Sequence, residues 1–496
     1  MRALLKAVND ARVVHLLFWV AGLASVLLVV QMGHPYDETE HAHVAWLMGK
    51  LGQRPLDDFF QHHMPLLWDI LKVYFLLGFD GPEVLYFGRL LVVLSMLVVG
   101  LGWVQLARLL TSSRIEADYA AALGIGSFAL LFLMMPDIIV IRPETLAAAS
   151  WVLSCLCWRY AFARSPDQDK FCLASGAFYC ASLFFSPRML FLIGWLGFLS
   201  GWRPSLKQVV FWVLGAAAFL LAYLSVCGCS LKYLYFAPYY SSVLQKVGGW
   251  DTASLLPWCP EPRPLLILGV VWVVLFRISS AQGRKTSWVH LGYLGLTCVA
   301  GWSSGYPHLY LQNFFPSYLS LSSSCLFLAT QIRWEAFPSP RRLVQWGLVG
   351  VCAWLVYSTR ALVDSDLTIF HIVELRRHVL GYLAPSDTVM MCYQMHPICA
   401  RDASYYGPWL GDSQNRMGEA VATVQQRFAL PRFSYLEDLK SARPRLVDTD
   451  LDLALHENEV PGLRGYLCEN YDTLLWRRRG IPLLLLRRET TATPTH

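Results

Sequence analysis

Charge is what this sequence has little of. Only 15% of its 496 residues are charged, whereas 55% are hydrophobic, and the mean hydropathy is +0.41. A soluble protein of this size needs far more charge, so the composition excludes that class and predicts a polytopic membrane protein. The net charge of +6 adds little, because in such a protein the positions of the basic residues matter more than their sum.

The sequence also lacks the signals of several other classes. Its 13 cysteines lie mostly in apolar runs, where a thiol acts as a small hydrophobe, and they match no zinc-ligand spacing. The first apolar run, 13–32, has no small-residue cleavage site, so we expect a signal anchor and not a cleaved signal peptide. No internal repeat is visible, and the one low-complexity segment is the final TTATPTH.

Long apolar runs, by contrast, are abundant. A helix needs about 20 mostly apolar residues to cross the hydrocarbon of a bilayer, and that rule predicts about eleven spans. They are expected at 13–32, 84–110, 118–135, 143–163, 171–186, 189–202, 208–228, 264–280, 287–303, 313–331 and 343–360. The pair within 171–202 is short, and the alternative for it is a single re-entrant hairpin.

Basic residues are unevenly divided between alternate loops. With the N-terminus inside, the inner loops carry Arg2, Lys6, Arg12, Arg108, Arg114, Arg159, Arg164, Lys170, Arg203, Lys207, Arg277, Arg284, Lys285, Arg333, Arg341 and Arg342. The opposite short loops hold only Arg142, Arg188, Lys232, Lys246 and Arg263. Lys and Arg favour the cytoplasmic side, so the bias places the N-terminus there. An odd number of spans then places the tail outside, together with the first loop.

The tail, 361–496, differs abruptly in composition from the rest. It is charged, has alternating stretches such as DTVMMCYQ (387–394), and includes the helical pattern DLTIFHIVELRRHVLGYL. The predicted fold is therefore an all-α polytopic membrane domain, 1–360, followed by a small extracytoplasmic α/β domain, 361–496. In that oxidising compartment Cys392 and Cys399 are candidates for a disulfide, with Cys468 as an alternative partner.

The first loop, 33–83, is too long to be a plain connector. It opens with HPYDETEHAH (34–43), after which apolar residues recur on one helical face, so we expect an amphipathic juxtamembrane helix from Asp37 to Leu51. Asp37 and Glu38 fall in its first turn, where the helix dipole favours negative charge. Ordinary helix capping therefore explains this pair as well as catalysis does.

The same loop carries a family resemblance. DETEHAHVAWLMGKLGQRPLDDFFQHHMPLLW resembles the first outer loop of polyprenyl-phosphate-dependent glycosyltransferases of the GT-C fold. The nearest are the protein O-mannosyltransferases and the bacterial lipid A aminoarabinose transferases, which have an Asp-Glu pair, a Gly, an aromatic pair and then Pro-Leu. The matching residues are Asp37-Glu38, Gly52, Phe59-Phe60 and Pro65-Leu66-Leu67-Trp68.

Later segments extend the resemblance along the chain in the same order. They are IRPETLAAASWVL (141–153), SPRML (186–190), YPHLYLQNFFPSYLSLSS (306–323) and RDASYYGPWL (401–410). The chain departs from the aminoarabinose transferases at His62 and His63, where those proteins carry an acidic-basic pair whose basic residue helps bind the donor phosphate. The resemblance gives that role to His63.

The resemblance implies transfer of a sugar from a polyprenyl-phosphate donor to an acceptor on the outer face. Such a reaction needs a base for the acceptor proton and groups that hold the phosphate. Asp37 is the candidate base, with Glu38 beside it to position the acceptor, and Glu144 is the second acidic candidate. The alternative for Glu144 is a first-turn carboxylate after Pro143, which is an ordinary helix start.

Cations are sparse on the outer side, which makes each of them informative. Arg142 and Arg188 are candidates for the donor phosphate, because a guanidinium holds phosphate in a bidentate fork. The alternative is that they reach lipid headgroups. His308 is either a further phosphate contact or the cap of the following span.

Histidines are frequent in the first loop, which raises the question of a metal. They are His34, His41, His43, His62 and His63. His41 and His43 are two apart and point to different faces of a helix, which is poor geometry for shared ligation, so no metal site and no cofactor is predicted.

Two other functional classes compete with an enzyme. A transporter or lipid flippase would have ionisable residues in mid-span, broken helices and inverted repeats, whereas the predicted spans here are nearly free of charge. A receptor or scaffold would leave the carboxylate-rich loop unexplained. The expected partners are the lipid-linked donor, membrane lipids and a protein, lipid or glycan acceptor, with no nucleic acid. The missing β-trefoil domain and ER-retrieval signal favour a bacterial inner membrane with a periplasmic site.

Overall fold

The computed structural model describes most of the chain. The described residues are 35–111, 116–121, 123, 141–163, 167–201, 203–248, 263–279, 288–292, 294–296, 315–332, 368–391, 395–406, 416–432, 434–449, 461–475 and 483–488. The predicted spans 13–32 and 343–360 lie outside these residues, as do His34, His308 and Cys392.

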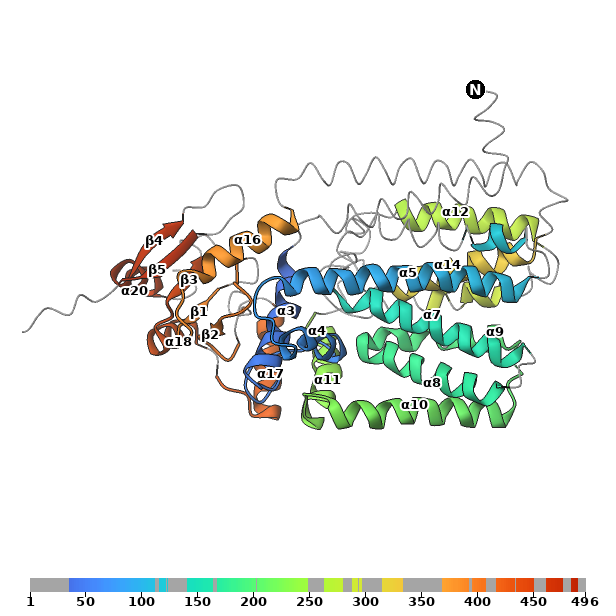
Figure 1. Ribbon diagram of the computed structural model, residues 1–496, viewed down its shortest axis with the longest axis horizontal. Coiled ribbons are helices and arrows are strands. Elements are labelled where there is room, and N and C mark those ends of the chain that lie inside the picture. The colour runs from blue at the N-terminus through green and yellow to red at the C-terminus, as the bar shows by residue number, and fades with distance from the viewer. Residues whose placement is uncertain are drawn as a thin grey trace, which may run out of the picture.

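The molecule has a helical bundle at one end and a sheet domain at the other (Figure 1). The bundle helices described are α5 (Val84–Leu110), α7 (Pro143–Phe162), α8 (Gln168–Phe185), α10 (Leu206–Val226), α12 (Arg263–Ile278) and α14 (Phe315–Thr330). Between bundle and sheet lie α3 (Pro35–Lys50), α4 (Leu66–Leu76), α11 (Leu231–Gly248) and α17 (Arg416–Phe428). The first loop and part of the tail therefore share the middle layer.

Two of the described helices are long and apolar enough to cross a membrane. They are α5, with 27 residues, and α10, with 21 residues, each reaching a mean hydropathy of 2.3. Most of each of the predicted spans 118–135 and 287–303 lies outside the described residues. At the remaining predicted spans, the described helices fall short of that length or hydropathy. The predicted second member of the short pair, 189–202, is not one spanning helix. It forms the 3-10 helix η2 (Pro187–Leu192) and the six-residue α9 (Gly194–Leu199), which are too short to cross a bilayer.

Two glycines bring α8 and α10 into close contact. A Cβ at Gly176 would lie 1.9 Å from the Trp212 carbonyl oxygen, and a Cβ at Gly215 would lie 1.9 Å from the Leu173 carbonyl oxygen. Small residues let two helix backbones approach in this way, which is how helices associate when lipid surrounds them.

The tail forms the predicted small α/β domain. Its sheet has the order β2-β1-β3-β5-β4, built from β1 (Thr388–Met390), β2 (Arg401–Asp402), β3 (Leu446–Thr449), β4 (Tyr471–Leu475) and β5 (Leu483–Arg487). Strand β1 pairs in parallel with β2 and β3, and the β3–β5 and β4–β5 pairs are antiparallel. The domain's other helices are α16 (Ile369–Leu380), α18 (Tyr435–Ala442) and α20 (Leu463–Asn470). Strand β1 and helix α16 confirm the two patterns read from the sequence.

Helix α3 is confirmed as a helix, but the prediction that it is amphipathic is wrong. Every residue from Glu38 to Met48 is buried, the polar ones included. The polar face does not meet water, because the sheet domain and the bundle cover α3 from both sides (Figure 1).

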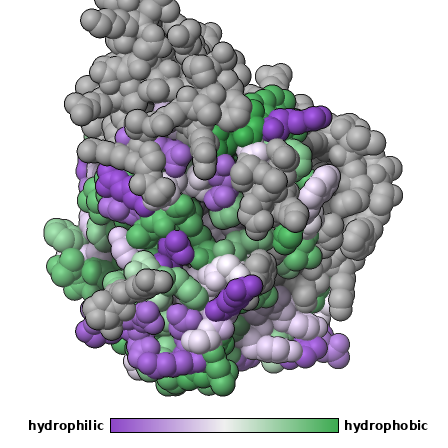
Figure 2. All heavy atoms as spheres, turned by 90° about the vertical axis from the view of Figure 1, so that its right-hand side faces the viewer, coloured by the Kyte–Doolittle hydropathy of each residue, from purple (hydrophilic) through white to green (hydrophobic). Residues whose placement is uncertain are grey.

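The end of the bundle opposite the sheet domain carries exposed hydrophilic residues. Figure 2 shows hydrophilic residues along the lower edge of this end, the side on which α10 lies in Figure 1. Exposed ion pairs here join Lys170 to Asp167 at 2.7 Å and Lys207 to Asp169 at 2.8 Å. Such exposed pairs contribute little to stability.

Candidate active site

The structure brings four of the predicted site residues together at the end of the bundle nearest α3. Asp37 is in the first turn of α3, and Arg142 is the N-cap residue of α7. Glu144 follows Pro143 in the first turn of α7, and Arg188 is in η2. The four share this end because each stands where the chain enters or leaves the bundle.

Their charges alternate along a row. The Arg142 guanidinium donates to the Asp37 carboxylate, and Arg142 Nε is 3.4 Å from Glu144 Oε2. Arg188 Nη1 is 4.0 Å from the other Glu144 oxygen, Oε1. The outer members are the accessible ones, since the Asp37 side chain is 29% exposed and that of Arg188 is 40% exposed. No described residue donates a hydrogen bond to buried Glu144 Oε2, whose cationic neighbour is Arg142 Nε at 3.4 Å.

Glu38 has a different place from the one expected. Its carboxylate forms a bidentate pair with Arg89 of α5, at 2.8 Å and 2.7 Å, and also accepts the Ile141 backbone N–H at 2.9 Å. Both side chains of the pair are fully buried. With its oxygens engaged and no access to solvent, Glu38 holds α3 to α5 and to the entry of α7. The structure thus argues against a direct role in positioning an acceptor.

A second polar cluster lies beside Asp37 and was not predicted as such. Gln61 Nε2 donates to buried Glu40 at 2.8 Å, and His63 Nε2 is 3.4 Å from the same carboxyl oxygen. Burial, and secondly the charge of Asp37, raises the pKa of Glu40 well above its usual range. Burial lowers the pKa of His63 well below its usual value, so the ring is neutral and can form hydrogen bonds without carrying charge.

The other two histidines of this cluster are also neutral. Burial lowers the pKa of His41 to about 3 and that of His62 to about 4. The Trp68 indole N–H donates to His41 Nδ1 at 2.9 Å, which assigns the proton of the neutral ring to Nε2.

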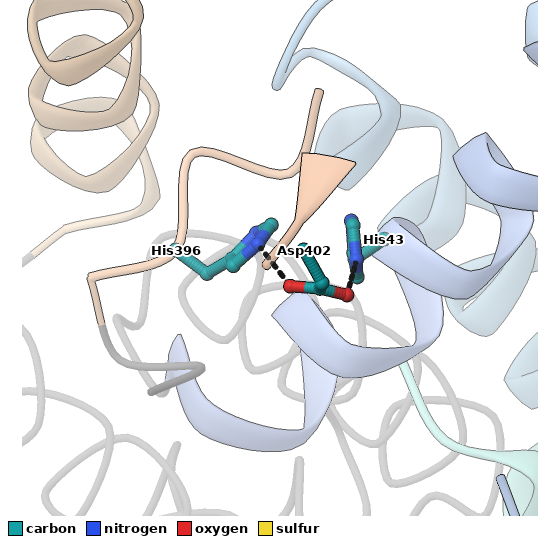
Figure 3. Close-up of side chains that lie close together, drawn as sticks. All are labelled: His43, His396 and Asp402. Atoms are coloured by element: carbon teal, nitrogen blue, oxygen red, sulfur yellow. Dashed lines mark hydrogen bonds and ion pairs between the residues drawn. The ribbon is translucent and has the colours of Figure 1, made fainter. Parts of the chain in front are cut away.

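The sheet domain is docked on α3 through a set of residues that sequence reasoning missed. His43 Nε2 is 2.8 Å from one oxygen of Asp402, and His396 Nε2 is 3.2 Å from the other, as Figure 3 shows. Arg376 of α16 donates to the hydroxyl of Thr39, which lies on α3. The first loop and the tail therefore meet on one side of the bundle, as the predicted topology requires.

The grouping of His43, His396 and Asp402 resembles a metal site, because one ligand atom from each lies within 4.8 Å of the others. The hydrogen bonds argue against it. The Ile398 backbone N–H donates to His396 Nδ1 at 3.0 Å, so the neutral ring must carry its proton on Nε2, the atom that would face a metal. His43 Nδ1 is 2.6 Å from the Ile398 carbonyl oxygen, so both of its nitrogens face oxygen acceptors. The three side chains form a hydrogen-bonded latch, which we call the His43–Asp402–His396 latch.

The latch predicts how stability depends on pH. Burial and the neighbouring His43 lower the pKa of His396 to about 4, while the charge of His43 and hydrogen bonds from both histidines lower that of Asp402 despite its burial. Between about pH 6.5 and 4, His396 is therefore protonated in the unfolded chain and neutral in the folded chain. Stability falls as the pH falls through this window, by up to about 3 kcal/mol from His396.

The test compares thermal stability at pH 7.5 and pH 5 in wild type, His396→Gln and His371→Gln. His41, His62 and His63 contribute with the same sign, so the wild-type loss alone does not isolate His396. We expect His396→Gln to reduce the loss by about 2 kcal/mol, whereas the exposed control His371→Gln leaves it unchanged. An unchanged loss in His396→Gln would show that His396 is not held neutral in the latch.

The residues that sequence reasoning missed differ in how clearly the sequence signals their role. Arg89 is a cation inside an apolar run, which is costly in a membrane and marks a residue with a buried partner. Asp402 and His396 give no such signal, since they lie in a polar tail that holds many similar residues.

No protein-family model matches this sequence, and no curated protein does either. Among solved structures, the crystal structure of ArnT from Cupriavidus metallidurans in the apo state is similar, with a TM-score of 0.42 and 12% identity. The similarity covers 95% of this chain and 97% of that chain. At this TM-score the likeness decides neither the fold nor the activity of the present chain.

Proposed function

We propose that this protein is a membrane glycosyltransferase of the GT-C type. It transfers a sugar from a polyprenyl-phosphate donor to an acceptor on the outer face of a bacterial inner membrane, the acceptor being a protein, lipid or glycan. The observation that carries the proposal is the row Asp37–Arg142–Glu144–Arg188 at one end of an apolar helical bundle. A carboxylate beside two guanidinium groups at a membrane surface matches the chemistry of a lipid-linked sugar phosphate.

Each member of the row has a part in the reaction. Asp37 takes the proton of the acceptor hydroxyl while the acceptor oxygen bonds to the anomeric carbon. The bond from that carbon to the phosphate oxygen breaks, and polyprenyl phosphate leaves with the electron pair. Arg142 and Arg188 bind the phosphate and stabilise the charge that develops on it. A guanidinium has five N–H donors, so Arg142 can contact Asp37 and the phosphate together.

Glu144 is a positioning residue in this scheme. It lies between the two guanidinium groups, 3.4 Å from Arg142 and 4.0 Å from Arg188, and reduces the repulsion between two cations that face one phosphate. Its buried site limits its motion, which keeps both cations in place.

Transport is less well supported than transfer. In α5 and α10 the charged residues are Arg89, Arg108 and Lys207, all close to a helix end. A transport path needs ionisable groups in mid-span, whereas the charged residues of these two helices lie near their ends.

The direct test uses purified protein, a labelled polyprenyl-phosphate sugar and candidate acceptors. We expect release of polyprenyl phosphate together with label on the acceptor. Comparison of surface glycans and glycoproteins from cells with and without the gene then identifies the acceptor class. Unchanged glycans combined with no donor turnover in vitro would refute the proposal.

Arg188→Ala is expected to weaken donor binding. A hydrogen bond to a charged group contributes about 1.5–3 kcal/mol, so the apparent affinity should fall about 10- to 100-fold. Excess donor should restore most of the rate, since Asp37 is untouched. The matched control is Arg203→Ala, an exposed cation in the inner loop before α10. A lower maximal rate with unchanged affinity would contradict the binding role.

A further inference from the structure

The turn VCGCS, 226–230, places two cysteines between α10 and α11. Cys227 is the C-cap residue of α10, and its backbone N–H donates to the Tyr223 carbonyl at 2.8 Å. Cys229 lies two residues before α11 begins at Leu231. Both side chains are partly exposed, so reagents in the surrounding solution can reach them.

A hydrogen bond joins the two cysteines across the turn. The Cys229 backbone N–H donates to Cys227 Sγ at 3.4 Å. A backbone donor of this kind favours the thiolate of Cys227, which is the reactive form.

Helix α4 fixes the compact shape of the turn. The Gly228 N–H points at Asp69 Oδ1, 3.4 Å away, and the Tyr223 hydroxyl donates to Asp69 Oδ2 at 2.6 Å. A Cβ on residue 228 would lie 3.2 Å from Lys72 Nζ, so glycine lets the ammonium group lie close to the turn.

The chain contains a second pair with the same spacing, which shows what geometry adds. Cys155 and Cys157 lie within α7, where residues two apart are about 200° apart around the helix axis. Their side chains point to opposite sides, so no disulfide can join them without unfolding the helix. Only the Cys227–Cys229 pair lies in a turn that lets its thiols meet.

We propose that Cys227 and Cys229 form a redox-active dithiol that exchanges with the disulfides of small thiol compounds. The Cys227 thiolate attacks one sulfur of the reagent disulfide, forming a mixed disulfide and expelling one thiolate. Cys229 then loses its proton and attacks Cys227 Sγ, which closes the Cys227–Cys229 disulfide and expels the second thiolate. The protein loses two electrons and two protons, and the reagent disulfide becomes two thiols.

The location suits this chemistry. The turn packs on α4 of the first loop, which the charge bias places outside the cytoplasm, where disulfides form and persist. Accessible disulfides in tight turns are the readily reduced kind, so the exchange is reversible. Helix α11 carries Tyr233, whose hydroxyl donates to the His63 carbonyl, so the turn connects directly with the histidine cluster.

The test measures thiols and needs no enzymatic activity. Purified full-length protein is equilibrated with reduced and oxidised glutathione in varying ratio, quenched with acid, alkylated and digested with trypsin. Peptide 208–232 contains Cys227 and Cys229 and no other cysteine. We expect it to lose two hydrogens at the oxidising end, without a glutathione adduct, and to regain two alkylatable thiols under excess reduced glutathione.

Two controls make the result decisive. Cys229→Ser removes the resolving thiol, so a stable glutathione adduct should appear on Cys227. The peptide that contains Cys155 and Cys157 should stay reduced throughout. Two free thiols in peptide 208–232 at every ratio, no adduct in Cys229→Ser, or oxidation of the α7 pair to the same extent would each overturn the proposal.

Discussion

Asp37→Asn should reduce sugar transfer by about two to four powers of ten, the usual contribution of a positioned general base. The substitution keeps the size of the side chain and removes its negative charge. Arg142 remains in place to bind phosphate, so donor binding should be nearly unchanged. The measurement is turnover and donor affinity with a labelled polyprenyl-phosphate sugar, taken separately.

A matched control separates this effect from a general change in charge. Asp57→Asn alters an exposed carboxylate in the same loop, and it should leave turnover at the wild-type level. Thermal stability of Asp37→Asn should also stay close to wild type, because the Asp37 side chain is 29% exposed and buried Arg142 keeps Glu144 as an anionic neighbour at 3.4 Å. Full turnover by Asp37→Asn would reduce Asp37 to a favourable charge at the start of α3. The base would then be sought at Glu144.

Arg89→Ala should have the largest effect on stability. It leaves the Glu38 carboxylate buried with its charge uncompensated, since Glu38 is 0% exposed. Removing one partner of a buried ion pair costs about 3–5 kcal/mol. Chemical or thermal denaturation in detergent micelles measures the loss, and Arg108→Ala, near the other end of α5, is the matched control.

A double substitution tests whether the buried charge is the cause. Glu38→Leu with Arg89→Met replaces both partners by apolar side chains of similar size, which is often neutral for stability. The double variant should be more stable than Arg89→Ala. It should remain about 1–3 kcal/mol less stable than wild type, because the Ile141 N–H loses its acceptor on Glu38. Turnover should return with stability. A stable double variant without turnover would give Glu38 the catalytic role that its buried contacts argue against.

The sequence by itself determined that the chain is a membrane protein and that the candidate site residues lie at one end of its helical bundle. Apolar runs long enough to cross a bilayer predicted α5 and α10, because the backbone of a spanning segment must satisfy its own hydrogen bonds as a helix. Successive loops lie on alternate sides of the membrane, and this alternation placed Asp37, Arg142 and Arg188 on the same side before any contact was known. Charge bias and span length are local properties, so one sequence is enough to read them.

Only the tertiary structure decided what each polar residue does. Successive residues on α3 are about 100° apart, so Asp37, Glu38 and Glu40 face three different neighbours although they are nearly adjacent in the sequence. Those neighbours, Arg142, Arg89 and Gln61, come from other segments. Asp402, the partner of His43, is 359 residues away, a separation at which no periodicity carries information. The two Cys-x-Cys pairs make the same point, since identical spacing forbids a bond within a helix and permits one in a turn.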